Sequence, residues 1–431
     1  MLNLYCILLT LLYVFEAFRG RKDLFSPRVV FNMFAWLKNV PYFWETGGLY
    51  PDVLAEKYFI IKVLSCIFVN LGITFYEKSR QNSFRFVYTE SAGTNKTKKY
   101  HSISLILFII GFAIKVYTIL DAGGLVYILS HLSNRRVLMA GLHYQELFSN
   151  TFLVCSALCA EVVVLTSNKR KGLLTFIIVS LVTFLSLAVF GARRPAIMFI
   201  LQLLICYHFV YKTIRFRSLF SLKYILAAIL ILLFIIFVPK LRESDNSELL
   251  DSPAEWIAGA AEESNRIFQE FSYLSGDMFV LEHFSSQNYW FGRSYLNILV
   301  QWIPRSLYSK KPPMDDGMYL YNMMCGIDVH PNDPTSKLYY QTSIPFTLEG
   351  ALFSNFGWLG IVLGCLLLGL FYQAIYKLVI DTNGALLSTL IYQELIFVFV
   401  PSVLHTTSML ISVLIYSLVL VPLFHIRIYK K

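Results

Sequence analysis

Between positions 239 and 341 the chain carries about a hundred mostly polar residues, and long apolar stretches flank this insert on both sides. A bilayer core accepts only hydrogen-bonded helices or closed barrels, so an irregular polar stretch of this length must lie outside it. The composition agrees with a membrane setting, because 56% of the residues are hydrophobic and only 15% are charged. We therefore predict a membrane protein that works in its one large aqueous loop, or where that loop meets the membrane.

Eleven apolar stretches are long enough to cross a bilayer as helices, which takes about 20 residues each. They cover residues 2–18, 25–42, 58–76, 101–120, 145–166, 173–190, 195–211, 220–238, 356–376, 385–402 and 407–424. The second stretch is the weakest, because Arg28 and Lys38 lie inside it. The pattern predicts an all-α integral membrane protein with about eleven transmembrane helices and one large extracytoplasmic loop between helices eight and nine. Helices one to eight would occupy 1–239, the loop 240–342 and the last three helices 343–431.

Basic residues gather in alternate connections between these stretches. The connections that hold them contain Arg19, Arg21, Lys22 and Arg28; Lys78, Arg80, Arg85, Lys96, Lys98 and Lys99; Lys169, Arg170 and Lys171; Lys212, Arg215 and Arg217; and Arg427, Lys430 and Lys431. Cytoplasmic loops carry such an excess, so the N-terminus is predicted outside and the C-terminus in the cytoplasm. This bias accounts for most of the net charge of +10. The sequence has no basic patch interleaved with stacking aromatics, so we expect no nucleic-acid partner.

Several cations fall on the predicted outer side, against this bias. Arg193 and Arg194 occupy a very short turn between two apolar stretches, and Arg135 and Arg136 lie in the preceding outer loop. A planar guanidinium makes bidentate hydrogen bonds to phosphate, so we expect these arginines to bind a lipid-linked pyrophosphate. Ordinary phospholipid headgroups offer the same partner, and that alternative stays open.

Three lysines lie toward the outer ends of predicted helices, namely Lys38, Lys62 and Lys115. Lysines at such positions reach the interface by extending their side chains along the helix, and we expect that here. Inside the insert, the apolar stretch 296–303 is too short to span the membrane. It should lie along the interface or dip into it, which would hold Arg305 and Lys311 at headgroup level.

Glu349 lies where the insert returns to the membrane, at the outer mouth of the ninth stretch. A carboxylate there is a candidate base or hydrogen-bonding anchor. An acid that merely favours the start of a helix is an equally good explanation. His330, from the preceding part of the insert, is a second candidate base.

Short motifs stand in a fixed order around the insert. They are Gly191-Ala192-Arg193, Ile303-Pro304-Arg305 followed by Lys311-Pro312, and Glu349-Gly350 followed by Asn355-Phe356-Gly357. With the large outward loop before the last three helices and the chain length, they resemble the bacterial oligosaccharide repeat-unit polymerases, the O-antigen polymerases called Wzy. The resemblance covers most of the chain and leaves open which polysaccharide is built.

The resemblance implies a multi-pass glycosyltransferase of the GT-C type in a bacterial inner membrane. Such enzymes transfer a growing glycan en bloc from undecaprenyl pyrophosphate to the nonreducing end of a new lipid-linked repeat unit, in O-antigen or capsule-type polysaccharide biosynthesis. The implied partners are the lipid-linked oligosaccharide, the bilayer, and a flippase and chain-length regulator of the same pathway. No cofactor and no metal are implied, and His283, His330 and His405 are too scattered in sequence to suggest a zinc site.

The resemblance also assigns roles. The leaving pyrophosphate needs fixed cations in the transition state. The residues expected to bind it are Arg135, Arg136, Arg193, Arg194, Arg293, Arg305 and Lys311. The catalytic set is expected to be Glu349, His330, Arg193 and Arg305, with Glu349 the first choice and His330 the second choice for the base that activates the sugar hydroxyl.

Two other functions fit the same sequence. An O-antigen ligase uses the same donor and transfers the glycan to a lipid A core, which an assay with lipid-linked repeat units alone distinguishes. A flippase or exporter of lipid-linked oligosaccharide is the other, and Glu161 and Glu394, within apolar stretches, favour it. Against it, the sequence shows no matched pair of broken helices.

Overall fold

The computed structural model divides into two compact units. It describes residues 1–21, 23–79, 85–90, 94–131, 141–167, 170–191, 193–214, 221, 272–285, 288–301, 303, 307–313, 315–334, 339–340, 342–398, 402–421 and 424–429. Unit 1 comprises Met1–Asn82, Asn265–Tyr376 and Leu395–Leu410, and unit 2 comprises Ser83–Ser264, Lys377–Glu394 and Ile411–Lys431. Both units are formed from segments far apart in the sequence.

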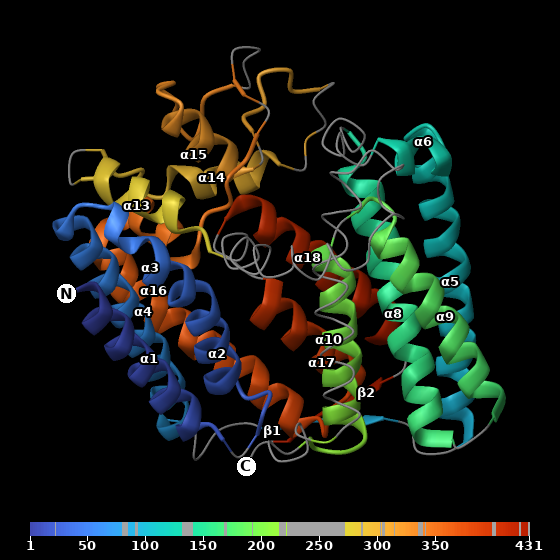
Figure 1. Ribbon diagram of the computed structural model, residues 1–431. Coiled ribbons are helices and arrows are strands. Elements are labelled where there is room, and N and C mark those ends of the chain that lie inside the picture. The colour runs from blue at the N-terminus through green and yellow to red at the C-terminus, as the bar shows by residue number, and fades with distance from the viewer. Residues whose placement is uncertain are drawn as a thin grey trace, which may run out of the picture. The chain divides into compact units, whose positions relative to one another are not determined.

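Unit 1 is built from N-terminal helices and from helices of the polar insert and the following span. Its helices are α1 (Leu2–Arg19), α2 (Pro27–Asn39), α3 (Pro41–Thr46), the 3-10 turn η1 (Gly47–Leu49), α4 (Asp52–Ser79), α13 (Leu274–His283), α14 (Arg293–Val300), α15 (Asp316–Met324), most of α16 (Leu348–Asp381) and the start of α18 (Val403–Leu420). Figure 1 shows α1, α2, α4 and α16 running side by side, with α13, α14 and α15 at one end of them. The insert therefore contributes folded helices to this unit.

Helices α4 and α16 approach each other through glycines. A Cβ on Gly72 would lie 2.2 Å from the carbonyl oxygen of Leu366, and one on Gly369 would lie 2.1 Å from that of Val69. Small residues allow such backbone contact between apolar helices, where packing rather than a hydrophobic driving force holds helices together. Gly357 interrupts α16 with φ 58°, a backbone conformation that favours glycine. The first turns of α16 are thereby set at an angle to the rest.

Unit 2 consists of apolar helices and one short ribbon. Its helices are α5 (Thr94–Asp121), α6 (Leu125–Ser130), α8 (His143–Ser167), α9 (Arg170–Ala188), α10 (Arg193–Val210), α17 (Leu386–Gln393), the start of the π-helical turn η4 (Glu394–Val398) and the end of α18. Helices α5 and α9 both pack along α8 (Figure 1). The ribbon pairs β1 (Arg85–Glu90) antiparallel with β2 (Phe424–Tyr429).

The ribbon is a small β element beside the helices that make up the rest of the described elements, and the predicted class of helical membrane protein holds. Backbone groups outside helices still need hydrogen-bond partners and here find them in each other. Arg85 stands opposite Tyr429 and Glu90 opposite Phe424. The loop charges predict that both of these connections lie in the cytoplasm, and that orientation stays a prediction.

Six described helices are long and apolar enough to cross a membrane, namely α1, α4, α5, α8, α16 and α18. Three further predicted spans appear as shorter apolar helices, Gly172–Ala188, Pro195–Val210 and Leu386–Phe397. The stretch 220–238 lies outside the described residues. The stretch 25–42 contains the 13-residue helix α2, which stops before Pro41. The protein is thus a multi-pass helical membrane protein, and the count of eleven spans stays a prediction.

The charge inside the weakest predicted span is satisfied by neighbouring helices. Arg28 is buried and donates to Glu16 Oε2 at 2.7 Å and to Thr74 Oγ1 at 2.8 Å. A third contact, at 3.4 Å, goes to Asn70 Oδ1. A buried charge needs a partner and further hydrogen bonds to offset its lost hydration. The network links α1, α2 and α4, so Arg28 belongs to the packing of these helices.

Two of the lysines expected at the interface lie inside the protein instead. Lys62 is 0% exposed and Lys115 is 1% exposed. Lys115 Nζ donates to Glu146 Oε2 at 2.6 Å and to Asn150 Oδ1 at 2.9 Å, which ties α5 to α8. The prediction that these lysines reach the interface is wrong. Each ammonium instead forms an ion pair with a carboxylate on a neighbouring helix, and this pairing offsets the loss of hydration on burial.

Candidate functional site

A buried ammonium in unit 1 is shared by two carboxylates. Lys62 Nζ, on α4, lies 2.8 Å from Asp277 Oδ2 on α13 and 3.0 Å from Glu349 Oε2 on α16. Its side chain is 0% exposed, and the two acidic side chains are each 7% exposed. Three segments far apart in the chain therefore meet at one charge.

Glu349 is held by a second donor. Ser65, one turn after Lys62 on α4, donates its hydroxyl to Glu349 Oε1 at 2.7 Å. Each oxygen of this carboxylate thus accepts one hydrogen bond from α4. An ionised carboxylate has about four lone-pair directions, so both oxygens keep acceptor capacity for a further donor.

Asp277 is oriented by the first residues of α16. Thr347 donates its hydroxyl to Asp277 Oδ1 at 2.5 Å, and the same Oγ1 accepts the backbone N–H of Gly350 at 2.9 Å. This is the arrangement of a helix N-cap, in which a hydroxyl satisfies a free N–H of the first turn. Thr347 therefore starts the helix that carries Glu349 and fixes the second carboxylate at the same time.

The residue after Glu349 must be small for this approach. A Cβ on Gly350 would lie 3.0 Å from Asp277 Oδ1 and 3.1 Å from Thr347 Oγ1. Such contacts are tighter than ordinary van der Waals distance. The Glu349-Gly350 pair is thus explained by the close approach of α13 to the start of α16.

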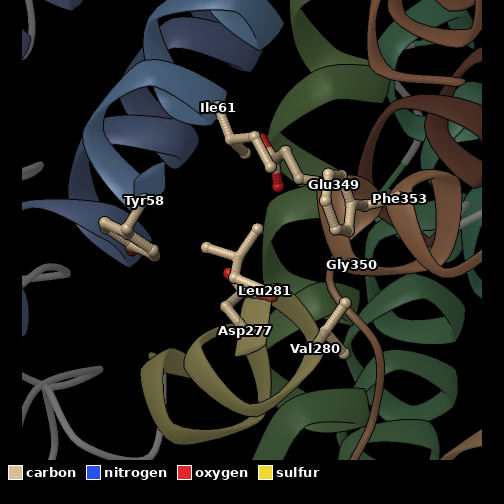
Figure 2. Close-up of a pocket in the computed structure, with 8 residues that line it drawn as sticks. All are labelled: Tyr58, Ile61, Asp277, Val280, Leu281, Glu349, Gly350 and Phe353. Atoms are coloured by element: carbon tan, nitrogen blue, oxygen red, sulfur yellow. The ribbon is translucent and has the colours of Figure 1, made fainter. Parts of the chain in front are cut away.

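A small pocket of about 10 Å³, room for about one water molecule, lies beside this cluster. It is lined by Tyr58, Ile61, Asp277, Val280, Leu281, Glu349, Gly350 and Phe353. Figure 2 shows these residues converging from α4, α13 and α16. The pocket combines two acidic groups with apolar and aromatic walls.

The charges at this pocket do not cancel. With both acids ionised, Lys62 neutralises one of them and leaves one negative charge. Burial raises the pKa of Asp277, and the nearby Lys62 ammonium lowers it in part. The cluster carries one negative charge in this state and becomes neutral when one of the two carboxylates takes up a proton.

The structure brings Glu349 to this pocket but not His330 or Arg293. His330 is exposed, with Nε2 3.9 Å from Asp328 Oδ1, and it does not line the pocket. Arg293 is exposed at the first position of α14. Neither side chain is on the lining of the pocket.

Lys311 is enclosed by the protein, and its predicted position at headgroup level stays a prediction. It is buried, and its Nζ donates to the carbonyl oxygens of Gln301 and Ile303, the latter at 2.9 Å. These bonds use the ammonium to close the turn after α14. They give the ammonium a structural role, and its part in binding pyrophosphate stays a prediction.

The remaining predicted pyrophosphate ligands are not positioned by the structure. Arg135, Arg136 and Arg305 lie outside the described residues. Arg193 and Arg194 form the first positions of α10, but the described part of the chain does not include their side chains. Their role stays a prediction from the sequence.

Two members of the cluster were missed from the sequence. The sequence context of Lys62 predicts an interfacial lysine. It does not predict Asp277 as a site residue, although this is the one acid in the first turn of the short apolar helix α13. The sequence signal that could have identified Asp277 was an acid within an apolar segment of the insert.

Comparison with known proteins adds one finding. A family model described as "Putative O-antigen polymerase" matches residues 23–270, which is more than half of the chain. No curated protein and no solved structure matches. The matched region contains Lys62 and ends before Asp277 and Glu349.

Proposed function

The chain belongs to the O-antigen polymerase family, and on this premise we propose that it is a membrane glycosyltransferase that polymerises oligosaccharide repeat units. Its substrates in this proposal are repeat units carried on undecaprenyl pyrophosphate. The growing glycan moves en bloc from its carrier to the nonreducing end of the next lipid-linked unit. The family match and the carboxylate pocket beside Lys62 support the proposal.

The reaction forms one bond and breaks one. The acceptor hydroxyl oxygen bonds to the anomeric carbon of the donor glycan, and the bond from that carbon to the pyrophosphate oxygen breaks. The electron pair leaves with undecaprenyl pyrophosphate. The proton of the acceptor hydroxyl passes to Glu349, whose two oxygens are held by Lys62 and Ser65. Such positioned base catalysis contributes roughly 10²–10⁴-fold.

The single observation that carries this role is the shared ammonium. Lys62 Nζ lies 3.0 Å from Glu349 Oε2 and 2.8 Å from Asp277 Oδ2. When Glu349 accepts the proton, Lys62 and Asp277 remain as a compensated pair. The charge of the cluster then moves from minus one to neutral, so that no unpaired buried charge remains after proton transfer.

The leaving pyrophosphate needs cations to stabilise its charge. Lys62 cannot serve, because its ammonium is already paired with Asp277 and Glu349. We assign that role to Arg193, Arg194 and Arg305, whose guanidinium groups suit phosphate. The carrier itself provides the leaving group, so the transfer takes no nucleotide sugar. The reaction takes place at the outer face of the inner membrane, with the N-terminus outside and the C-terminus in the cytoplasm.

The test is reconstitution with a single substrate. Purified protein in proteoliposomes receives undecaprenyl-pyrophosphate-linked repeat units and nothing else, and products are separated by size. A ladder of glycans that differ by one repeat unit is expected. Transfer only after a lipid A core is added would identify a ligase, and movement of the substrate across the bilayer without a ladder would identify a flippase.

The matched control is Glu282→Gln. Glu282 is exposed on α13 and does not line the pocket. The same chemical change at Glu282 should leave the ladder intact, whereas Glu349→Gln should reduce it.

A further inference from the structure

Helix α14 has its polar side chains inside the protein and its apolar side chains outside. Ser294 and Asn297 on the helix, and Gln301 just after it, are buried. On the opposite face, Leu296 is 56% exposed and Leu299 is 74% exposed. A helix on the surface of a water-soluble protein has the reverse arrangement, with its apolar stripe against the core. The outward face of α14 is therefore unsuited to water.

The inward polar face of α14 is fixed by hydrogen bonds within unit 1. Ser294 donates its hydroxyl to Asn355 Oδ1 at 2.9 Å. Asn297 donates its side-chain amide to the carbonyl oxygen of Pro331 at 2.5 Å. Buried polar groups that lose such partners cost free energy, so the helix cannot rotate to bury its leucines. The apolar face is thus presented outward by the fold itself.

The outward face of α14 is continuous with exposed apolar surface on α16. Helix α16 is long and apolar enough to cross a membrane, and its side chains Leu359, Leu363 and Leu367 are exposed. The ring of Tyr295 on α14 stacks on that of Phe356 on α16, with the ring centroids 6.3 Å apart. Exposed apolar patches of this kind mark contact with a membrane or a partner. Because the exposed face of a spanning helix meets lipid, the same lipid is next to α14.

The charge of this part of the insert favours a lipid surface as the partner. Residues 283–314 contain no aspartate or glutamate, and they carry Arg293, Arg305, Lys310 and Lys311. In the structure, Arg293 at the start of α14 and Lys310 in the following turn are exposed. Apolar side chains next to cations are the combination that binds the boundary between acyl chains and anionic headgroups.

We propose that α14 and the turn after it form a membrane-docking surface, whose contacts are Arg293, Leu296, Leu299 and Lys310. The leucines enter the boundary between headgroups and acyl chains in the adjacent leaflet. The two cations bind the phosphate groups of anionic lipids in that leaflet.

This docking surface sets where the insert meets the bilayer. Ser294 binds Asn355, which follows Glu349 on α16 by about two helical turns. Docking of α14 therefore keeps Glu349 close to the level of the headgroups. The inference goes beyond the proposed function, because a ligase or a flippase with this insert would need the same contact.

Spin labels at single cysteines measure whether the docking surface lies in lipid. Leu299→Cys and, as a control, Asp328→Cys are each made in a Cys325→Ser background, since Cys325 is exposed and the other six cysteines are buried. In lipid nanodiscs, the label at position 299 should collide with oxygen and be shielded from a water-soluble nickel chelate. The label at Asp328, whose side chain is 95% exposed, should show the opposite preference. Equal access of the chelate to both labels would overturn the proposal.

The same label distinguishes lipid from a protein partner. A label covered by protein is shielded from oxygen as well as from the chelate, and that result would also overturn the proposal. Spin–spin broadening between labelled chains would then identify a second copy of the protein as the occupant. Shielding without broadening would identify a different protein.

Lipid composition tests the two cations. Access of the chelate to the label at position 299 is compared in phosphatidylcholine nanodiscs with and without phosphatidylglycerol. The anionic lipid should favour the docked state by about fivefold for each cation, the contribution of a basic residue near such a surface. Combining Arg293→Gln with Lys310→Gln should remove this difference, whereas Lys57→Gln, at an exposed lysine of α4, should keep it. The same access with and without anionic lipid in the parent protein would exclude headgroup binding by these cations.

Discussion

Lys62 and Asp277 are 215 positions apart in the sequence, and their side chains form a 2.8 Å ion pair inside the protein. This pair joins α4, an apolar helix of membrane-spanning length, to α13, a helix of the polar insert. Through the same ammonium it reaches Glu349 at the start of α16. The insert is therefore joined to the membrane helices at the proposed catalytic residue. Removing the insert would leave the buried charges of Lys62 and Glu349 without Asp277.

Replacing Glu349 with glutamine should abolish catalysis while keeping the fold. The amide is nearly isosteric, and its oxygen can still accept a hydrogen bond, but it cannot take the proton of the sugar hydroxyl. Turnover in the proteoliposome assay should fall by roughly 10²–10⁴-fold, with the thermal unfolding midpoint close to that of the wild type. Near-normal polymerisation by the purified variant would exclude the base role and leave Glu349 as an anchor for Lys62.

Removing the shared cation should destabilise the protein. Lys62→Met leaves Asp277 and Glu349 buried together without compensation, and breaking a buried pair in this way costs about 3–5 kcal/mol. Lower protein yield and a lower unfolding midpoint in detergent are expected. Adding Asp277→Asn and Glu349→Gln to the same chain should recover part of that loss, because the uncompensated charges are then gone. No recovery in the triple variant would contradict this account.

Asp316 should make stability depend on pH. Its Oδ2 accepts the backbone N–H of Val403 at 3.0 Å, its Oδ1 has no hydrogen-bond partner among the described residues, and burial raises its pKa to about 7. The unfolded value is about 3.9. Between these two values the unfolded chain releases the proton and the folded protein keeps it. Stability contributed by this group is therefore complete below pH 4 and is lost as the pH rises toward 7, by at most about 1.4 kcal/mol per pH unit.

The measurement is the unfolding midpoint of wild type and Asp316→Asn across pH 4 to 8. The difference between the two curves reports on Asp316 alone. The unfolding midpoint of the variant should rise relative to that of the wild type as the pH rises. Asp328→Asn, at a side chain that is 95% exposed, should follow the wild type. Parallel curves for wild type and Asp316→Asn would show that Asp316 is ionised throughout this range.

The outward arginines should be needed for polymerisation. Arg193→Ala and Arg305→Ala should each eliminate long glycan chains at normal protein levels, because the leaving pyrophosphate loses a fixed cation. Lysine at either position should rescue only partly, since it keeps the charge but not the bidentate geometry. Wild-type ladders from both alanine variants would remove these arginines from the mechanism.

The predicted orientation can be checked by labelling single cysteines in whole cells. Ser286→Cys lies in the insert and Lys431→Cys at the C-terminus, both in a Cys325→Ser background. An impermeant thiol reagent should modify the first and not the second, because the alternate Lys and Arg loops place the C-terminus in the cytoplasm. Modification of Lys431→Cys in intact cells would reverse the topology.

Both the membrane class and the position of Glu349 could be predicted from the sequence, because both depend on local patterns. Hydropathy and loop charge are properties of consecutive residues, and six of the predicted spans appear as helices of sufficient length and apolarity. Glu349 stands at the boundary between insert and span, so its position could be identified without knowing any contact. The family resemblance was confirmed by the match over residues 23–270.

The role of a charge inside an apolar helix could not be predicted in the same way. Lys62 and Lys115 have the sequence context of interfacial lysines, yet both are buried against carboxylates. Whether a lysine reaches the interface or an ion pair depends on which helix packs beside it. That neighbour can be hundreds of residues away.

What the sequence determined by itself was a multi-pass membrane protein of the O-antigen polymerase family, with an acid where the insert meets an apolar helix. Apolar length, charge bias and short motifs are local patterns, which is why the sequence alone could show them. What only the tertiary structure decided was that Lys62, Asp277 and Glu349 form one cluster beside a pocket. Their meeting depends on the packing of α4, α13 and α16, and the energy that keeps three charges buried together comes from their mutual compensation. No single segment contains that information.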